Sequence, residues 1–272
     1  MQSLETSTSC VLPFEIVEMI IDLLAEQNNI NSLKATSLVC QSVLPRCRKY
    51  LFSSIEINKD SKSTEMCLTL LSPKTDIPKY IRKLEYHLRG NTLSTIHPAL
   101  LARISCLQSL IFRYSEDLGA YDWTEIDPSV RSALINLMHL PTLTDLRLIH
   151  INHFPASHLF SCTGLKHLQL DYVDIADESP CTLLPSKLDI VTVPRIQEYT
   201  VKGSASTTMA LSTAKLVDGR VALDFTNLKR LSVDLEANED VEATRHLLKE
   251  FKQVEELRVD GKRGFFRSLF PS

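Results

Sequence analysis

The sequence lacks the signals of a membrane or secreted protein. Its 272 residues contain no run of about 18 apolar residues, no charged-then-apolar leader and no Asn-x-Ser/Thr acceptor. These absences argue against a membrane-spanning helix, a secretory route and N-glycosylation. We therefore expect a soluble intracellular protein, in the cytoplasm, the nucleus or both, with no membrane partner.

Glycine is scarce, with seven residues in the chain. The sequence has no G-x-G-x-x-G, no P-loop and no G-x-S-x-G, so the usual phosphate-binding loops and the nucleophile elbow are absent. Acidic pairs such as Glu255 and Glu256 fall on the surfaces of predicted elements, where runs of charge are ordinarily solvated. We therefore predict a protein that is not an enzyme, with no catalytic residue and no cofactor, and hydrolase or metalloenzyme is the least favoured class.

Cysteine pairs with metal-site spacing are missing. The seven cysteines are scattered and include no C-x-x-C motif, which indicates a reducing compartment and structural roles. His150, His153, His158 and His167 gather with Cys162 in one short stretch and raise the alternative of a zinc site. A structural zinc site needs four converging ligands, usually in short paired spacings, and His167 is expected on the outward face of a strand. We interpret these residues as loop and surface histidines and predict no metal site.

A basic excess is also absent, because the formal net charge is −3. A nucleic-acid-binding protein usually carries a clustered Lys/Arg surface. Here only the segments 46–49 (RCRK) and 261–267 (GKRGFFR) approach one. We interpret both segments as solvated surfaces and expect no nucleic-acid partner.

The most informative stretch that is present reads LPFEIVEMIIDLL, at residues 12–24. Pro13 suits the first position of a helix and acids follow in the first turn, which predicts a helix over 13–25. Apolar residues fill about 240° of its circumference, whereas the apolar stripe of an ordinary surface helix spans roughly 100°. Two sides of this helix therefore need cover, from its own domain or from a partner. The remaining polar stripe, about 80° wide, consists of Glu15, Glu18, Asp22 and Glu26.

The following residues predict two more short helical segments. Apolar periodicity resumes over 32–44, Pro45 interrupts it, and the basic turn at 46–49 leads to Ile55 and Ile57, which alternate as a short extended exit. Three short helices in about 45 residues bury little apolar surface on their own. We therefore expect this unit to pack against a neighbour.

Downstream of this unit, an apolar triplet with L-x-x-L-x-L spacing recurs seven times. The copies are Ile81/Leu84/Tyr86, Leu107/Leu110/Phe112, Leu143/Leu146/Leu148, Leu165/Leu168/Leu170, Ile196/Tyr199/Val201, Leu228/Leu231/Val233 and Val254/Leu257/Val259. Their starts are between 22 residues (Leu143 to Leu165) and 36 residues (Leu107 to Leu143) apart. The residues that alternate with the triplets are polar except Ile111 and Ile149, as in strands with one buried face.

Helix signals lie between the predicted strands. Asp127 and Pro128 are placed to cap and start one helix, and Asn238 is placed to cap another. Strand, loop and helix at this spacing are typical of a leucine-rich solenoid, whose parallel sheet has a polar concave face, so the predicted fold class is α/β. Segments 174–193 and 202–222 lack a periodic pattern and are predicted to be long irregular loops.

Residues 12–57 resemble the F-box, in particular the variant found in fungal F-box proteins with irregular leucine-rich repeats. The matching positions are Leu12, Pro13, Ile16, Ile20, Leu24, Leu33, Val39 with Cys40, and Leu51 with Phe52, where the family often has Leu-Trp. Segments 70–86 and 140–170 are similar to the degenerate repeats of the same proteins. One departure is Val43, which stands where the family usually has a Trp after the Val-Cys pair.

The resemblance implies an organisation and a function. The F-box would dock on the Skp-type adaptor of an SCF-type cullin-RING E3 ubiquitin ligase, and the repeats would bind the target protein. The implied domains are a disordered tail (1–11), a three-helix F-box (12–57), a linker helix (58–80) and an irregular leucine-rich-repeat domain (81–272). The implied adaptor contacts are Leu12, Pro13, Ile16, Ile20, Leu24, Leu33 and Val39. The expected target contacts on the concave face are Arg113, Asp145, Arg147, His167, Gln169, Asp171, Arg230, Asp234 and Arg258.

Two alternatives stay open. The chain also suits a leucine-rich-repeat scaffold protein whose F-box-like unit only caps the first repeat and has no ligase role, in which case the opening helix is covered from within. At the other end, the aromatic residues of GKRGFFRSLFPS either cap the open edge of the solenoid or begin a further repeat of a longer protein.

Overall fold

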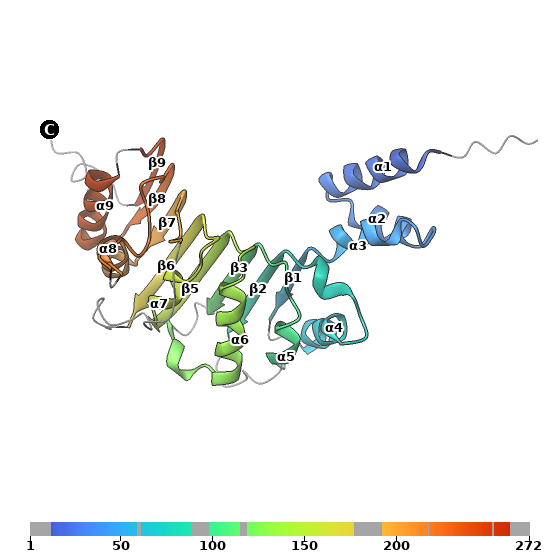
Figure 1. Cartoon of the computed structure of the whole chain (residues 1–272), viewed down its shortest axis with the longest axis horizontal. Helices are drawn as coiled ribbons and strands as arrows, with labels where there is room; N and C mark the ends of the chain where they lie inside the picture. Colours follow the sequence, from blue (N-terminus) through green and yellow to red (C-terminus); the bar gives the residue numbers. More distant parts are fainter. Residues whose placement is uncertain are drawn as a thin grey trace, which may run out of the picture. The chain divides into compact units, whose positions relative to one another are not determined.

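The structure, a computed structural model, describes residues 12–58, 61–88, 98–114, 119–176, 192–216, 218–251 and 253–261. The chain divides into two compact units, Met1–Ser53 and Ser54–Ser272. The described residues form nine α-helices and one nine-stranded sheet of parallel strands, which confirms the α/β class (Figure 1). The predicted tail (1–11), most of the predicted loop 174–193 and the aromatic segment after Gly261 lie outside the described residues.

The N-terminal unit consists of three short helices, α1 (Phe14–Glu26), α2 (Ile30–Ser37) and α3 (Leu44–Leu51). Helix α1 begins one residue later than predicted, because Pro13 occupies its N-cap. The predicted apolar segment 32–44 divides into α2 and a turn, and Asn29 caps α2 by accepting a hydrogen bond from the Ser32 N–H. A small core joins the three helices and consists of Ile21, Leu33, Val43 and Cys47, with Val17 and Leu24 packed beside it.

The polar stripe of α1 forms an ion-pair cluster with α3. Arg46 donates hydrogen bonds to both carboxylate oxygens of Asp22 and also lies 3.2 Å from a carboxylate oxygen of Glu18. The Tyr50 hydroxyl donates a third hydrogen bond to Asp22, at 2.8 Å. Hydrogen bonds from Arg46 and Tyr50 lower the pKa of Asp22 to about 2. Part of the predicted solvent-facing stripe therefore holds α1 to its own unit.

The second unit is built on the parallel sheet. Its strands pair in the order β1-β2-β3-β5-β6-β7-β8-β9, and β4 pairs with β5 off this path. The second and third residues of each predicted triplet lie on adjacent strands in matching register. Leu84, Leu110, Leu146, Leu168 and Tyr199 therefore face one another in one buried row. The strands are β1 (Ser54–Ile57), β2 (Lys83–Leu88), β3 (Ser109–Tyr114), β4 (Tyr121–Asp122), β5 (Asp145–Phe154), β6 (His167–Ile175), β7 (Glu198–Lys202), β8 (Arg230–Leu235) and β9 (Glu256–Gly261).

Strand β1 corrects the predicted boundary of the first domain. Ile55 and Ile57 were expected to close the unit 12–57, but they pair with Leu84 and Tyr86 and are buried in the core of the sheet. The first strand of the sheet therefore follows the three helices directly. The predicted linker helix 58–80 is a helix, α4 (Ser61–Leu71), followed by a short 3-10 turn, η1 (Ile77–Tyr80).

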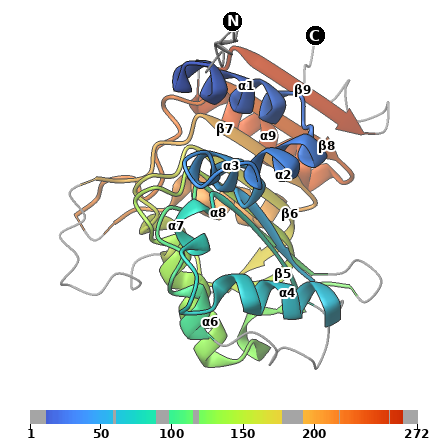
Figure 2. The same cartoon turned by 90° about the vertical axis from the view of Figure 1, so that its right-hand side faces the viewer.

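The connecting helices lie along one side of the sheet. Figure 1 shows α4 to α9 on this side, and Figure 2 shows α4 and α6 there together. Trp123 is buried between the sheet and these helices, with its ring 5.6 Å from Phe112 and 4.8 Å from Phe154. The remaining elements are α5 (Pro98–Leu101), η3 (Trp123–Glu125), α6 (Pro128–Met138), α7 (Ser157–Phe160), α8 (Ala205–Thr213) and α9 (Asn238–Glu250).

One of the two predicted helix caps is confirmed and the other is wrong. The Asp127 carboxylate accepts hydrogen bonds from the N–H groups of Ser129 and Val130 at the start of α6. Asn238 is instead the first residue of α9. The Asp240 carboxylate accepts the hydrogen bonds of the Glu236 and Ala237 N–H groups and so fixes the chain entering this helix.

The predicted loop 202–222 contains a helix, α8, which corrects the prediction. Its buried side carries the hydroxyl groups of Thr207 and Thr208 beside a single apolar side chain, Leu211. Thr207 Oγ1 donates to the carbonyl of Val173 at 2.7 Å, and Ser204 Oγ accepts from the Val173 N–H at 2.8 Å. Thr208 Oγ1 lies 2.7 Å from the buried hydroxyl of Tyr199. The helix is therefore held to β6 and β7 by hydrogen bonds, a pattern that hydrophobic periodicity does not detect.

Candidate protein-binding surfaces

One side of α1 is left open to solvent by its own unit. At 100° per residue, four exposed apolar residues of this helix fall within roughly 100° of its circumference. Together with the exposed Leu12, which lies just before the helix, they form what we call the α1 apolar face. The opposite side carries Ile21, which is fully buried in the small core. The helix is therefore apolar on two sides, and its own unit covers only one of them. The α1 apolar face consists of Leu12, Ile16, Met19, Ile20 and Leu23.

The predicted adaptor contacts divide between this face and the interior. Leu12, Ile16 and Ile20 belong to the α1 apolar face, and Pro13 is exposed at its N-terminal end. Leu24 packs partly buried against the small core. The exposed residue Val39 lies in the turn after α2, beside the equally exposed Leu38.

Leu33 is the predicted adaptor contact that the structure contradicts. Its side chain is fully buried among the three helices, so it is not accessible to a partner. Val43, at the position where the F-box proteins that this segment resembles usually have a tryptophan, is also buried in the small core. The side chain at this position therefore contributes to the packing of the unit and is not part of the α1 apolar face.

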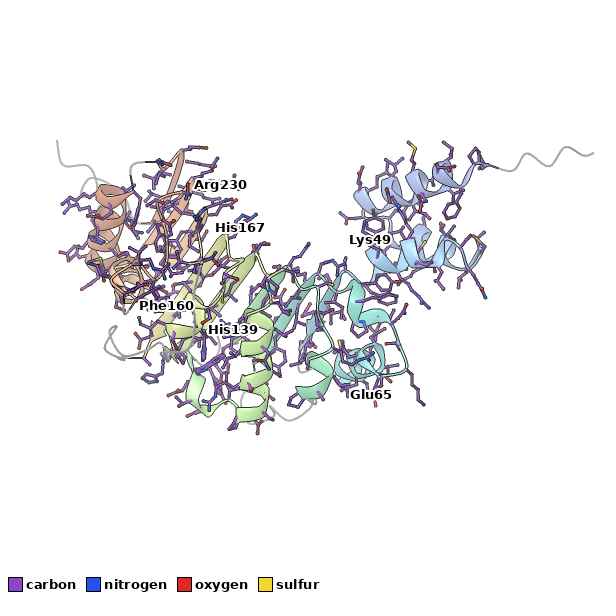
Figure 3. All side chains as sticks on the ribbon, in the orientation of Figure 1. Lys49, Glu65, His139, Phe160, His167 and Arg230 are labelled. Atoms are coloured by element: carbon purple, nitrogen blue, oxygen red, sulfur yellow. The ribbon has the colours of Figure 1, made fainter. Side chains whose placement is uncertain are left out.

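The second surface of interest is the polar face of the sheet, formed by the side chains that alternate with the buried triplets. All nine predicted target contacts lie on this face or on its edge strand β9, and adjacent strands bring them together in register. In Figure 3, His167 and Arg230 point from this face, whereas His139 and Phe160 lie on the side covered by helices.

A continuous chain of polar contacts crosses the polar face. Asp145 accepts a hydrogen bond from Ser109 Oγ at 3.0 Å and lies 3.2 Å from Arg147 Nε. His167 lies between two carboxylates, with Nδ1 3.8 Å from Asp145 and Nε2 3.3 Å from Glu198. Arg230 in turn pairs with Glu198. Glu198 was not predicted from the sequence, because its partners His167 and Arg230 lie on β6 and β8, which are about 30 residues away on either side.

Other predicted contacts on the polar face are paired locally. Gln169 Nε2 donates to Asp171 at 2.7 Å, and burial raises the pKa of this carboxyl group. The Asp234 carboxylate pairs with Lys202 Nζ at 3.0 Å. Like Glu198, Lys202 was not among the contacts predicted from the sequence. Arg258 Nε donates to Asp260 at 3.0 Å. An exposed ion pair such as Arg258 with Asp260 is worth about 0–1 kcal/mol, so a bound protein can replace it at little cost.

The centre of the polar face is less polar than its sequence pattern indicates. Ile111 and Ile149, the two apolar exceptions to the alternation, are buried there. They lie opposite Arg147 and Arg113 on the neighbouring strands. Burial lowers the pKa of His167, although Asp145 opposes this effect. This centre therefore combines an apolar floor with charged side chains on the neighbouring strands.

The histidines of segment 150–167, the candidate zinc ligands, each contact different residues. His153 Nδ1 lies 2.8 Å from Asp122, and the His150 ring stacks on Tyr172 with centroids 4.8 Å apart. The His158 ring lies 5.8 Å from His139, and burial lowers its pKa to about 4. Among the residues that the structure describes, no three His, Cys, Asp or Glu side chains are grouped so as to hold a metal ion.

Comparisons with known proteins do not assign the chain to a family. No family model matches the chain, and no curated protein matches it. In the described part of the chain, no helix is both long and apolar enough to cross a membrane. A proposal about function therefore has to be argued from the two surfaces and from the resemblance of the first helices to the F-box.

Proposed function

We propose that this chain is the substrate-recognition subunit of an SCF-type cullin-RING E3 ubiquitin ligase. In this proposal the α1 apolar face docks on the Skp-type adaptor, and the polar face of the sheet holds the target protein. The observation that carries the proposal is the exposure of five large apolar side chains on one side of α1, opposite a side that already packs on Ile21.

The size of the α1 apolar face suits a docking surface. Fully burying a Leu, Ile or Met side chain contributes about 1.5–3 kcal/mol, so covering five half-exposed ones contributes roughly 5 kcal/mol. Association itself costs about 4–15 kcal/mol, so this face alone is a marginal binding site. Leu38 and Val39 are further exposed apolar residues of the same unit and would supply additional contact.

The protein would act without catalytic residues of its own. An adaptor-bound receptor holds the target near the ubiquitin-carrying enzyme and so raises the effective concentration of the target's lysines. The charged side chains of the polar face are already paired with one another. Binding of the target would therefore depend on complementary shape and on exchange of these ion-pair partners more than on long-range electrostatic attraction.

Co-expression with a Skp-type adaptor tests this proposal. We expect the full chain and the adaptor to elute as one complex of one copy each in size-exclusion chromatography. If the two proteins elute separately, the receptor function is wrong. The scaffold alternative, in which the α1 apolar face is covered within the chain, would then account for the same sequence features.

A further inference from the structure

A groove of about 480 Å³ lies where the ends of β6, β7 and β8 meet the first turns of α8 and α9. Ala205 and the exposed Met209 form an apolar side of the groove, and Tyr172 forms a wall. The rim carries three glutamates, Glu236, Glu239 and Glu242.

The Tyr172 wall is held in place by three neighbours. Its ring stacks on His150, and its hydroxyl donates a hydrogen bond to Glu236 Oε1 at 2.7 Å. Gly203 lies against the ring, and a Cβ atom at this position would lie 2.5 Å from Tyr172 Cδ1. The Tyr172 wall is therefore already fixed before a ligand binds, so less conformational entropy is lost on binding.

The charges at the rim are not balanced. Glu236 lies 3.5 Å from Lys202 Nζ, and the buried Asp240 carboxylate accepts two backbone hydrogen bonds. Glu239 and Glu242, which are three residues apart on one side of α9, form no ion pair with any residue in the described part of the chain. A helix N-terminus carries only about +0.5 of a charge, so the two carboxylates dominate the groove. The polar face of the sheet, in contrast, is largely paired.

We propose that this groove binds an arginine side chain in an extended segment of the target protein, with an apolar residue next to the arginine. The planar guanidinium can engage Glu239 and Glu242 together, and its aliphatic stem can lie on Met209. The groove also continues from the polar face, because Lys202 and Glu236 connect the two. Only the identification of the segment as part of a ubiquitylation target rests on the proposed function.

Methionine methyl NMR on the full chain tests this inference. The chain has five methionines, of which Met209 lines the groove, Met66 is an exposed control on α4 and Met19 lies on the α1 apolar face. The probe is the peptide acetyl-Ala-Leu-Arg-Leu-Ala-amide, and its citrulline analogue is the neutral control. We expect the arginine peptide to shift the Met209 methyl signal with a Kd on the order of 1 mM or below.

Charge variants sharpen the test. Replacing Glu239 and Glu242 together by Gln should weaken the arginine peptide at least about fivefold, and so should the citrulline substitution. Glu250→Gln, at the other end of α9, is the matched control and should bind like the wild type. The inference is overturned if the Met209 signal does not move, if the citrulline peptide binds equally well, or if Met66 moves as much as Met209.

The same spectra separate this inference from the proposed function. Addition of the adaptor is detected at Met19, so an unmoved Met19 signal refutes adaptor docking and leaves the result at Met209 unaffected. The other candidate occupant is the basic end of the chain, since Gly261 pairs with Leu235, the residue before Glu236. If replacing Lys262, Arg263 and Arg267 by Gln shifts Met209 without any peptide, the chain itself fills the groove and the inference falls.

Discussion

Ile20→Asp is expected to weaken adaptor binding at least about 100-fold, which corresponds to about 2.7 kcal/mol. The Ile20 side chain is 44% exposed on the α1 apolar face, so the substitution leaves the small core unchanged. In the complex, however, the new carboxylate would be buried against apolar groups without a partner, which costs several kcal/mol. Isothermal titration calorimetry with the purified adaptor measures the loss.

Two control variants make this result specific. Ile21→Asp, one residue further on, places a charge in the small core and should unfold the N-terminal unit, whereas Ile20→Asp should keep the wild-type circular dichroism and melting temperature. Met66→Asp changes another exposed apolar residue, on α4, and should bind the adaptor normally. Wild-type affinity in Ile20→Asp would exclude the α1 apolar face as the docking surface.

Leu146→Ala should destabilise the sheet unit by about 3 kcal/mol. Leu146 is fully buried in the row of apolar side chains that crosses the sheet from β1 to β9. Truncation leaves a cavity that the paired strands on both sides cannot close. For a unit of this size, the expected fall in melting temperature is roughly 6–12 °C, measurable by calorimetry or by circular dichroism.

The neighbouring residue provides the matched control for this prediction. Arg147 lies on the polar face, where it pairs with Asp145 in solvent, so Arg147→Ala should change the stability by less than about 1 kcal/mol. Equal effects of the two substitutions would contradict the alternation of buried and exposed positions along β5. The same comparison can be repeated on any central strand, because the register is shared.

The sheet could be predicted from the sequence because its signal is both local and repeated. Each triplet has the two-residue period of a strand with one buried face, and the parallel register follows from aligning the triplets. Strand β1 was assigned to the wrong unit because its partner, β2, lies beyond an intervening helix. Helix α8 was missed because Thr207 and Thr208 bury hydroxyl groups, and their partners Val173 and Tyr199 come from other strands.

The candidate surfaces could be predicted only in part. The periodicity of 12–24 shows that α1 is apolar on two sides, but it does not determine which side packs inward. For this reason the exposed residues Met19 and Leu23 were not named. Leu33, which belongs to α2 and was named from the resemblance, is fully buried. The groove between α8 and α9 could not be predicted at all, since its walls come from three segments that are distant in sequence.

Hydroxyl-radical footprinting tests the central claim, that the α1 apolar face is open in the free chain and covered by the adaptor. Met19 and Met66 are 65% and 62% exposed, so they form a matched pair on α1 and α4. We predict similar oxidation of both residues in the free protein and a several-fold lower oxidation of Met19 alone after the adaptor is added. Protection of Met19 in the free chain, or equal oxidation of both residues with adaptor present, would contradict the account.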